Sequence, residues 1–179
     1  KKPYYKDTCF KEDNEWEKTY APRTRINLML QSCMCVSYTS PKTMHWITKL
    51  LSWLYDDNNI QKKLSSFQDD TEKIAKDEVK SFIKNKDNYR QGVKTPHIVL
   101  NYLDYLLWTK RNEKEYQNLK FDQFSFEYRN SVEHWYPQHP SKESFVEWKD
   151  VNRFGNLCII QRDINSKFSN LSPVSKKNT

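Results

Sequence analysis

Apolar residues recur at helical spacing through most of the first two thirds of this chain. Between residues 26 and 107 they return every three or four positions, which places them along one side of an α-helix. Two helix start signals fall in this region, because Ser40-Pro41 and Thr95-Pro96 each combine a capping side chain with a proline suited to a first helical turn. We therefore predict a mainly α fold built on a helical bundle.

Four helices are expected from this spacing. The second spans about residues 42–55 and the third about residues 70–84. The fourth is apolar around most of its circumference, so we expect it at the centre of the bundle. The expected apolar stripes are Ile26, Met29, Leu30, Cys33 and Ser37; Met44, Ile47, Leu50, Leu51 and Leu54, with Trp46 and Trp53 beside them; Ile74, Ala75, Val79, Phe82 and Ile83; and Ile98, Val99, Tyr102, Leu103, Tyr105, Leu106 and Leu107.

The spacing changes to the period of a strand after residue 120. Phe124, Phe126 and Tyr128 alternate with polar residues, which predicts a strand over residues 121–128. A second strand is expected over residues 156–161, followed by a helix, and together these form a ββα layout with His134 at the end of the first strand. The full expected order is an N-terminal arm (residues 1–21), a helical body (22–119) and a small ββα module (120–179), with a short helix near 144–149 and the last helix from Asp163.

The composition excludes several classes of protein. With only two glycines, Gly92 and Gly155, the chain cannot form a glycine-rich phosphate loop or a dinucleotide-binding fingerprint. No apolar run is long enough to span a bilayer, and the four cysteines form no C-x-x-C pair. We expect a cytoplasmic, soluble part of a longer protein, with reduced thiols and no membrane association.

The positive charge lies mainly in the first part of the chain. Of the formal net charge of +7, residues 1–120 carry +6 and residues 121–179 carry +1. A basic body beside a nearly neutral chemical site suits a protein that holds the backbone of a polyanion. Solvated lysine-rich helices would have the same charge, so the charge alone leaves both interpretations open.

The residues with the most distinctive chemistry lie between positions 131 and 170. Glu133 precedes His134, and Asn156 and Asn165 follow, nine positions apart. Hydrolysis of a phosphodiester needs a base that deprotonates water and a cation that stabilises charge on the phosphate. An imidazole ordinarily titrates near neutral pH, so His134 is a suitable general base. The side-chain oxygens of Glu133 and Asn165 suit Mg²⁺ or Mn²⁺.

Other residues of this stretch have supporting roles. Adjacent strand residues point to opposite faces, so Glu133 and His134 converge on one phosphate only if the strand bends there. Asn156 is expected to act indirectly, through hydrogen bonds from its amide to the backbone of the loop that carries His134. The candidates for contacting DNA phosphates are the lysines expected at the surface near the C-terminus: Lys167, Lys176 and Lys177.

This order of residues resembles the His-Asn-Asn form of the HNH (ββα-metal) nucleases. More closely, it is similar to the C-terminal nuclease domain of GmrSD-like modification-dependent restriction enzymes, over about residues 124–177. Glu133 stands where many relatives carry Asp, and Asn165 stands where many carry His. The matching strings are Val132-Glu133-His134-x-x-Pro137-Gln138, Phe154-Gly155-Asn156-Leu157 and Asn165-Ser166-Lys167-x-x-Asn170.

The resemblance implies a metal-dependent DNA endonuclease or nickase of an antiphage restriction protein. His134, Asn156 and Asn165 would be its catalytic residues, and Glu133 and Asn165 would hold Mg²⁺ or Mn²⁺. Its partners would be double-stranded DNA, modified or not, and an N-terminal NTPase and recognition region of the same parent protein or complex. The alternative is a non-catalytic helical module that binds nucleic acid or a protein partner and carries a decayed nuclease site.

Overall fold

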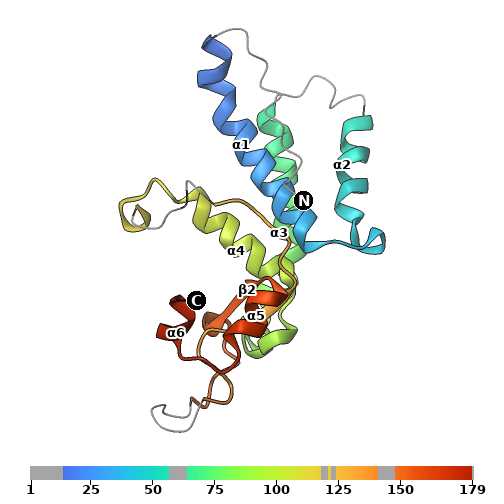
Figure 1. Cartoon of the computed structure of the whole chain (residues 1–179). Coiled ribbons are helices and arrows are strands. Elements are labelled where there is room, and N and C mark those ends of the chain that lie inside the picture. Colours follow the sequence, from blue (N-terminus) through green and yellow to red (C-terminus); the bar gives the residue numbers. More distant parts are fainter. Residues whose placement is uncertain (1–13, 57–63, 118–120, 122–123, 141–147, 179) are drawn as a thin grey trace. The chain divides into compact units, whose positions relative to one another are not determined.

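The computed structural model describes residues 14–56, 64–117, 121, 124–140 and 148–178. This part of the chain contains six α-helices, two strands and several 3-10 helices (η) (Figure 1). In order they are α1 (Asn14–Ser37), η1 (Pro41–Thr43), α2 (His45–Tyr55), α3 (Leu64–Lys84), η3 (Lys86–Arg90), η4 (Gly92–Lys94), α4 (His97–Thr109), η5 (Lys114–Tyr116), β1 (Ser131–His134), η7 (Phe154–Asn156), β2 (Leu157–Ile160), α5 (Arg162–Phe168) and α6 (Pro173–Lys177). The predicted mainly α fold with a small ββα module is confirmed, since β1, β2 and α5 follow one another. None of the described helices has the length and apolar character needed to cross a membrane.

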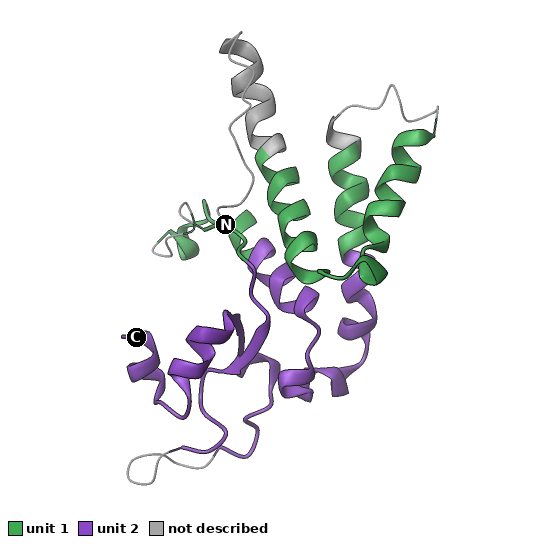
Figure 2. Ribbon diagram, turned by 45° about the vertical axis from the view of Figure 1, so that its right-hand side comes forward, with its two compact units in different colours: residues 1–75, 107–127 green, residues 76–106, 128–179 purple. Residues whose placement is uncertain are grey.

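The chain forms two compact units (Figure 2). The first contains residues 1–75 and 107–127, and the second contains residues 76–106 and 128–179. The second unit carries β1, β2, α5 and α6, and with them the predicted chemical residues. It also includes residues 76–106, which the sequence-based division assigns to the helical body. The arm, body and module predicted above remain a division made on sequence alone.

Helix α1 begins at Asn14, inside the segment predicted as an N-terminal arm. Residues 14–21 of the expected arm are therefore helical. This first part of the helix has no apolar stripe and so gave no periodic signal, but its Glu, Lys and Ala residues have high intrinsic helix propensity. Further along α1, Leu30 and Cys33 of the predicted stripe are fully buried.

Neither predicted proline-containing start signal caps an α-helix. The side chain of Ser40 makes no capping hydrogen bond, and its carbonyl instead accepts the Thr43 hydroxyl at 2.8 Å. The Thr95 hydroxyl donates backwards to the carbonyl of Gly92, also at 2.8 Å. Hydroxyl side chains that bond nearby carbonyls build turns of this kind, and both α-helices begin shortly after such a turn.

The buried face of α2 differs from the predicted stripe. Trp46 and Leu50 are buried, whereas Leu51 and Leu54 are 49% and 51% exposed. In α3, which begins six residues before its predicted start, Ile83 is likewise 56% exposed. The prediction that Leu51 and Leu54 are buried is wrong, because periodicity defines a broad apolar side while packing buries only the strip that meets another element.

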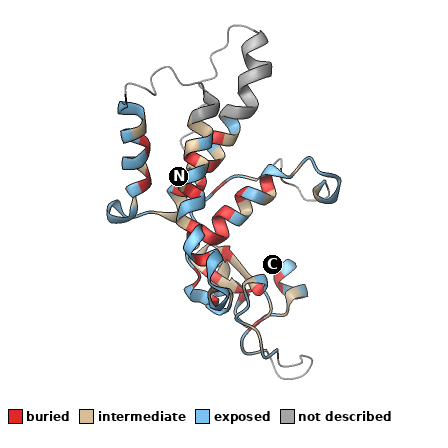
Figure 3. Ribbon diagram, turned by 180° about the vertical axis from the view of Figure 1, so that it is seen from behind, coloured by how far each residue is buried: buried red, intermediate tan, exposed pale blue. Residues whose placement is uncertain are grey.

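The core of the second unit forms where α4 packs on the strands. β1 and β2 pair antiparallel, and Leu100 of α4 is buried together with Val132 of β1 and Ile159 of β2. Buried positions run along α4 (red in Figure 3), which agrees with its nearly continuous apolar sequence. One face of the two-stranded sheet is therefore covered by this helix.

The strand predicted over residues 121–128 is not found in the part of that range that the structure describes, residues 121 and 124–128. Residues 124–130 have no regular secondary structure, and β1 begins only at Ser131. Phe126 is buried against Phe124, with ring centroids 5.0 Å apart, while Tyr128 is 57% exposed. A strand needs a hydrogen-bonded partner as well as alternating side chains, and the spacing of residues does not reveal that partner. The short helix predicted near residues 144–149 falls largely outside the described residues.

Arg129, immediately before β1, links α4 to β2. Its guanidinium contacts the carboxylate of Asp104 at 2.8 Å, donates to Asn101 Oδ1 at 2.8 Å and donates to the Ile159 carbonyl at 3.4 Å. Burial raises the pKa of Asp104, and the neighbouring guanidinium opposes that rise. The Arg129 guanidinium therefore offsets the desolvation cost of the partly buried Asp104 carboxylate.

Replacing Arg129 with Met should destabilise the protein by about 3 kcal/mol, because the partly buried Asp104 carboxylate loses its cation. Without the guanidinium, the pKa of Asp104 in the folded protein rises further above its unfolded value. The loss of stability should therefore be small at acid pH, where Asp104 is protonated, and should grow as the pH rises through the ordinary titration range of aspartate. Urea unfolding at acid and at neutral pH measures both effects. Arg162→Met is the control, since Arg162 is exposed and pairs with no described residue. Equal losses in the two variants would contradict the role given to Arg129.

Candidate active site

The candidate site residues Glu133 and His134 lie on opposite faces of β1. Pairing with β2 continues to His134, the last residue of the strand. Val132 and His134 are buried, whereas Ser131 and Glu133 are partly exposed, as expected for side chains that alternate between two faces. Because the pairing is unbroken, Glu133 and His134 leave the strand on opposite faces. The bend that would make them converge within the strand is absent.

His134 is held by a side chain that the sequence did not single out. Its residue surface is 3% exposed, and Nε2 lies 2.9 Å from Oδ1 of Asn152. The same oxygen also accepts from Gln138 Nε2 at 3.3 Å. Since Oδ1 is an acceptor, the hydrogen bond requires the His134 proton on Nε2. A neutral His134 then has its lone pair on Nδ1.

Asn152 is fixed in turn by Gly92, in the loop before α4. The Gly92 amide donates to the Asn152 carbonyl at 3.3 Å. Gly92 has φ +55°, and a Cβ at this position would lie 2.5 Å from Asn152 Oδ1. Both the backbone conformation and the close approach therefore require glycine. Gly92, one of the two glycines of the chain, thus directly contacts Asn152, the partner of His134.

The amide of Asn156 joins the two loops around His134. Asn156 is 3% exposed; its Oδ1 accepts from the Tyr136 amide at 2.7 Å, and its Nδ2 donates to the Tyr136 carbonyl at 3.0 Å. Nδ2 also donates to the Val151 carbonyl at 2.8 Å, next to Asn152. The predicted contact between this amide and the loop that carries His134 is confirmed. The same side chain also holds the segment that contains Asn152.

Lys176 occupies an unexpected position on the other face of β1. Its side chain is fully buried, and Nζ donates to Glu133 Oε1 at 2.7 Å and to the His134 carbonyl at 2.5 Å. The Phe168 ring lies 5.7 Å from the same ammonium. The prediction of Lys176 as a surface residue is wrong, because the short helix α6 turns this lysine inward towards a carboxylate.

Asn165 lies on the face of β1 that carries Glu133. Its Nδ2 donates to Ser131 Oγ at 2.6 Å, two residues before Glu133 along the strand. Lys167 and Lys177 are exposed, as expected for candidate phosphate contacts. Among the residues that the structure describes, no group of three or more His, Cys, Asp or Glu side chains is arranged to hold a metal ion.

Among the described residues, three cysteines form no disulfide: Cys33, Cys35 and Cys158. Cys158 faces the Glu133 carbonyl, with Sγ 3.7 Å from the oxygen. Burial raises its pKa to about 11, and the Glu133 carboxylate adds to that rise while Lys176 opposes it. Cys158 is therefore a neutral thiol at physiological pH and is poorly suited to binding a metal.

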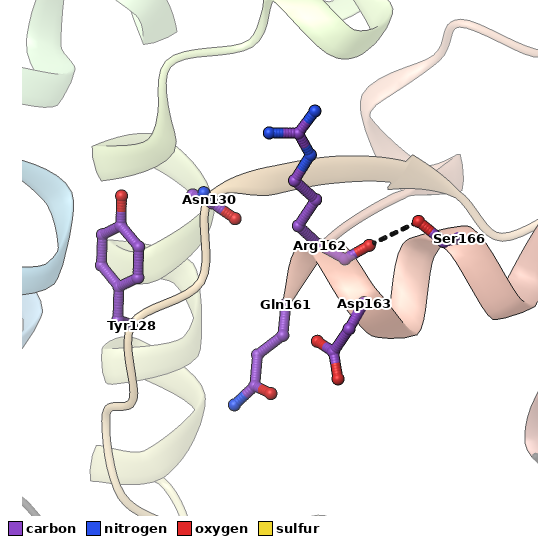
Figure 4. Close-up of a pocket in the computed structure, with 6 residues that line it drawn as sticks. All are labelled: Tyr128, Asn130, Gln161, Arg162, Asp163 and Ser166. Atoms are coloured by element: carbon purple, nitrogen blue, oxygen red, sulfur yellow. Dashed lines mark hydrogen bonds between the residues drawn. The ribbon is translucent and has the colours of Figure 1, made fainter. Parts of the chain in front are cut away.

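A shallow polar cleft lies at the opposite end of β1 from His134. Its volume is about 560 Å³, and it is lined from the segment before β1 and from the start of α5 (Figure 4). Arg162 and Asp163 contribute opposite charges, and the Arg162 carbonyl accepts from the Ser166 hydroxyl at 3.0 Å. The remaining lining residues are Tyr128, Asn130 and Gln161. This cleft does not include any of the predicted catalytic residues.

The sequence reasoning missed Asn152, Gln138 and Gly92 as residues that shape the site. Gln138 and Gly92 had been noted, the first in a motif and the second as a rare glycine, but neither could be linked to His134. Asn152 carried no signal of its own, since a single asparagine in a polar segment is common in turns.

Comparison with known proteins identifies a family for this chain. Residues 73–179 match the model of the family described as GmrSD restriction endonucleases, C-terminal domain. The match spans more than half of the chain, and the chain therefore belongs to this family of restriction nuclease domains. Neither the curated proteins nor the solved structures include a match to it.

Replacing Lys176 with Met should destabilise the protein by about 3 kcal/mol, because Glu133 and the His134 carbonyl both lose a buried charged donor. Its neighbour Lys177 is exposed, so Lys177→Met should change stability very little. Thermal unfolding of the two variants provides the comparison. Identical melting temperatures would show that the buried ammonium contributes nothing to the fold.

Replacing Asn152 with Ala should lower nuclease activity by about 10- to 100-fold while leaving most of the stability, since His134 loses the acceptor that orients it. The Nε2 proton of His134 should be protected and visible by proton NMR in the wild type and lost to exchange in the variant. Asn152→Asp, which keeps an acceptor oxygen, should retain the proton signal. A protected His134 proton in Asn152→Ala would rule out this contact.

Proposed function

We propose that this chain is a metal-dependent HNH nuclease module of a restriction protein and that it hydrolyses phosphodiester bonds of DNA. The observation that carries the proposal is the setting of His134. Its imidazole lies at the end of the first strand of a ββα module, bonded to Asn152, with the loop that follows it fixed by Asn156. Family membership supports nuclease chemistry in general, and the HNH assignment rests on these side chains.

In this proposal His134 is the general base. With the proton on Nε2 held by Asn152, Nδ1 accepts the proton of the attacking water. The resulting imidazolium keeps its Nε2 proton, so the bond to Asn152 survives the transfer. A correctly placed base of this kind contributes about 10²- to 10⁴-fold to the rate.

Glu133 and Asn165 would hold the Mg²⁺ or Mn²⁺ ion. Lys176 contacts Glu133 Oε1, whereas neither Glu133 Oε2 nor Asn165 Oδ1 bonds to any described residue. A carboxylate and an amide oxygen, completed by water and phosphate oxygens, form a donor set that Mg²⁺ accepts. The bound ion would stabilise the negative charge that develops on the phosphate.

The position of His134 at the strand end allows the base and the metal ligands to act together. Glu133 and His134 lie on opposite faces of β1, but no further strand residue separates the two faces beyond His134. In this proposal, a phosphate bound past the end of β1 contacts groups from both faces. The substrate would be double-stranded DNA, delivered by an NTPase and recognition region of the parent protein or complex.

One observation favours a second candidate function. The ammonium of Lys176 already neutralises Glu133, as would happen in a DNA-binding module whose nuclease site has decayed. Such a module would bind DNA without cleaving it in any metal, and the cleavage experiment separates the two functions.

His134→Ala should abolish metal-dependent nicking of supercoiled plasmid while DNA affinity is retained, because the variant loses proton abstraction and no backbone contact. Wild-type activity should require Mg²⁺ or Mn²⁺ and disappear with EDTA. His139→Ala is the matched control, since His139 is exposed a few residues away and should leave activity unchanged. Full nicking by His134→Ala would exclude His134 as the base, and wild-type protein inactive in every metal would favour the second function.

A further inference from the structure

A second cleft, of about 480 Å³, lies beside the loop that fixes His134. Residues 153–155 form one wall and η3 forms the other. The cationic side chains of Lys86, Arg90 and Arg153 line it, against a single lining carboxylate, Asp87. Unlike the cleft in Figure 4, where Arg162 is balanced by Asp163, this one is predominantly basic.

Both walls of this cleft are joined to the catalytic arrangement. Residues 153–155 lie between Asn152, which bonds His134, and Asn156, which fixes the following loop. The η3 wall is attached through ring contacts of Phe154 with Phe82 and Tyr89, at centroid distances of 5.8 and 6.0 Å. The cleft is therefore connected to the loop that contacts His134.

The charges of the cleft are available to a ligand. Arg90 and Arg153 both contact Asp150, Arg90 at 4.0 Å, but these pairs are solvent-exposed and contribute little to stability. Lys86 is exposed and forms no ion pair with any described residue. The surrounding segment, residues 84–94, holds four cationic side chains and one carboxylate. The ion pairs within the protein therefore leave part of this positive charge unneutralised.

We propose that this cleft is a binding site for the sugar–phosphate backbone of duplex DNA, next to the bond that is cut. Guanidinium groups bind phosphate through paired hydrogen bonds, and a lysine adds a point charge, so Arg90, Arg153 and Lys86 together match a row of phosphates. The site takes up the role that the sequence assigned in part to Lys176, whose ammonium is buried. This inference rests on the proposed function for its substrate, but it concerns binding rather than cleavage.

The test compares two charge-matched double variants of the whole chain. Lys86→Gln with Arg90→Gln removes two cations of the cleft, whereas Lys42→Gln with Lys114→Gln removes two exposed lysines of the other unit. Affinity for a fluorescent DNA duplex is measured over a salt series in EDTA, which prevents cleavage. The plot of log K against log salt concentration should be less steep by about 2 for the cleft variant, because two phosphate contacts are lost. The control variant should keep the wild-type slope. In plasmid nicking, the cleft variant should have a raised KM and an unchanged kcat.

Several outcomes decide the proposal. A wild-type slope and KM in the cleft variant would overturn it, and so would equal losses in both double variants, which would indicate a general effect of net charge. Wild-type protein that binds no DNA would overturn it as well. Selective loss of the slope in the cleft variant, with no cleavage by the wild type in any metal, would support this binding site while contradicting the proposed nuclease function.

Discussion

The buried amide of Asn156 is the interaction on which the arrangement around His134 depends. With two hydrogen bonds to Tyr136 and one to Val151, a single side chain fixes the loop after β1 and the segment before β2. If the two loops separated, the buried amide would lose these partners and carry the full cost of its desolvation. This cost keeps the two loops together. Asn152 sits in the second of these loops, and its contact with His134 is consequently determined by the same amide.

A second constraint reaches the site from the connection between α3 and α4. Gly92 approaches Asn152 so closely that no side chain fits between them, and its carbonyl accepts the Thr95 hydroxyl. The polar segment before α4 is therefore part of the surroundings of His134 as well as a connector. It also supplies the basic wall of the proposed backbone-binding cleft, so one segment both contacts the partner of His134 and provides positive charge nearby.

Lys176 gives the opposite face of β1 its electrostatic character. Burying an ammonium is favourable only with good partners, and here Glu133 and the His134 carbonyl provide them. The ammonium anchors the Glu133 side chain, and the same contact anchors α6 against the strand. In the proposed nuclease, the second oxygen of Glu133 serves the metal ion, so the carboxylate has both a structural and a chemical partner.

The sequence by itself indicated the mainly α fold with its small ββα module, and it singled out the residues around His134 as candidates. Helical spacing identified the four helices of the first part, and the order of Glu133, His134, Asn156 and Asn165 indicated the ββα module and the contact of Asn156 with its loop. The tertiary structure alone decided that Lys176 is buried, that Asn152 holds His134 and that Leu51 and Leu54 remain half exposed. Periodicity and motifs are properties of neighbouring positions, whereas these features depend on contacts between segments far apart in the chain. Which side of an apolar helix is covered, and which lysine turns inward, is settled only when those segments pack.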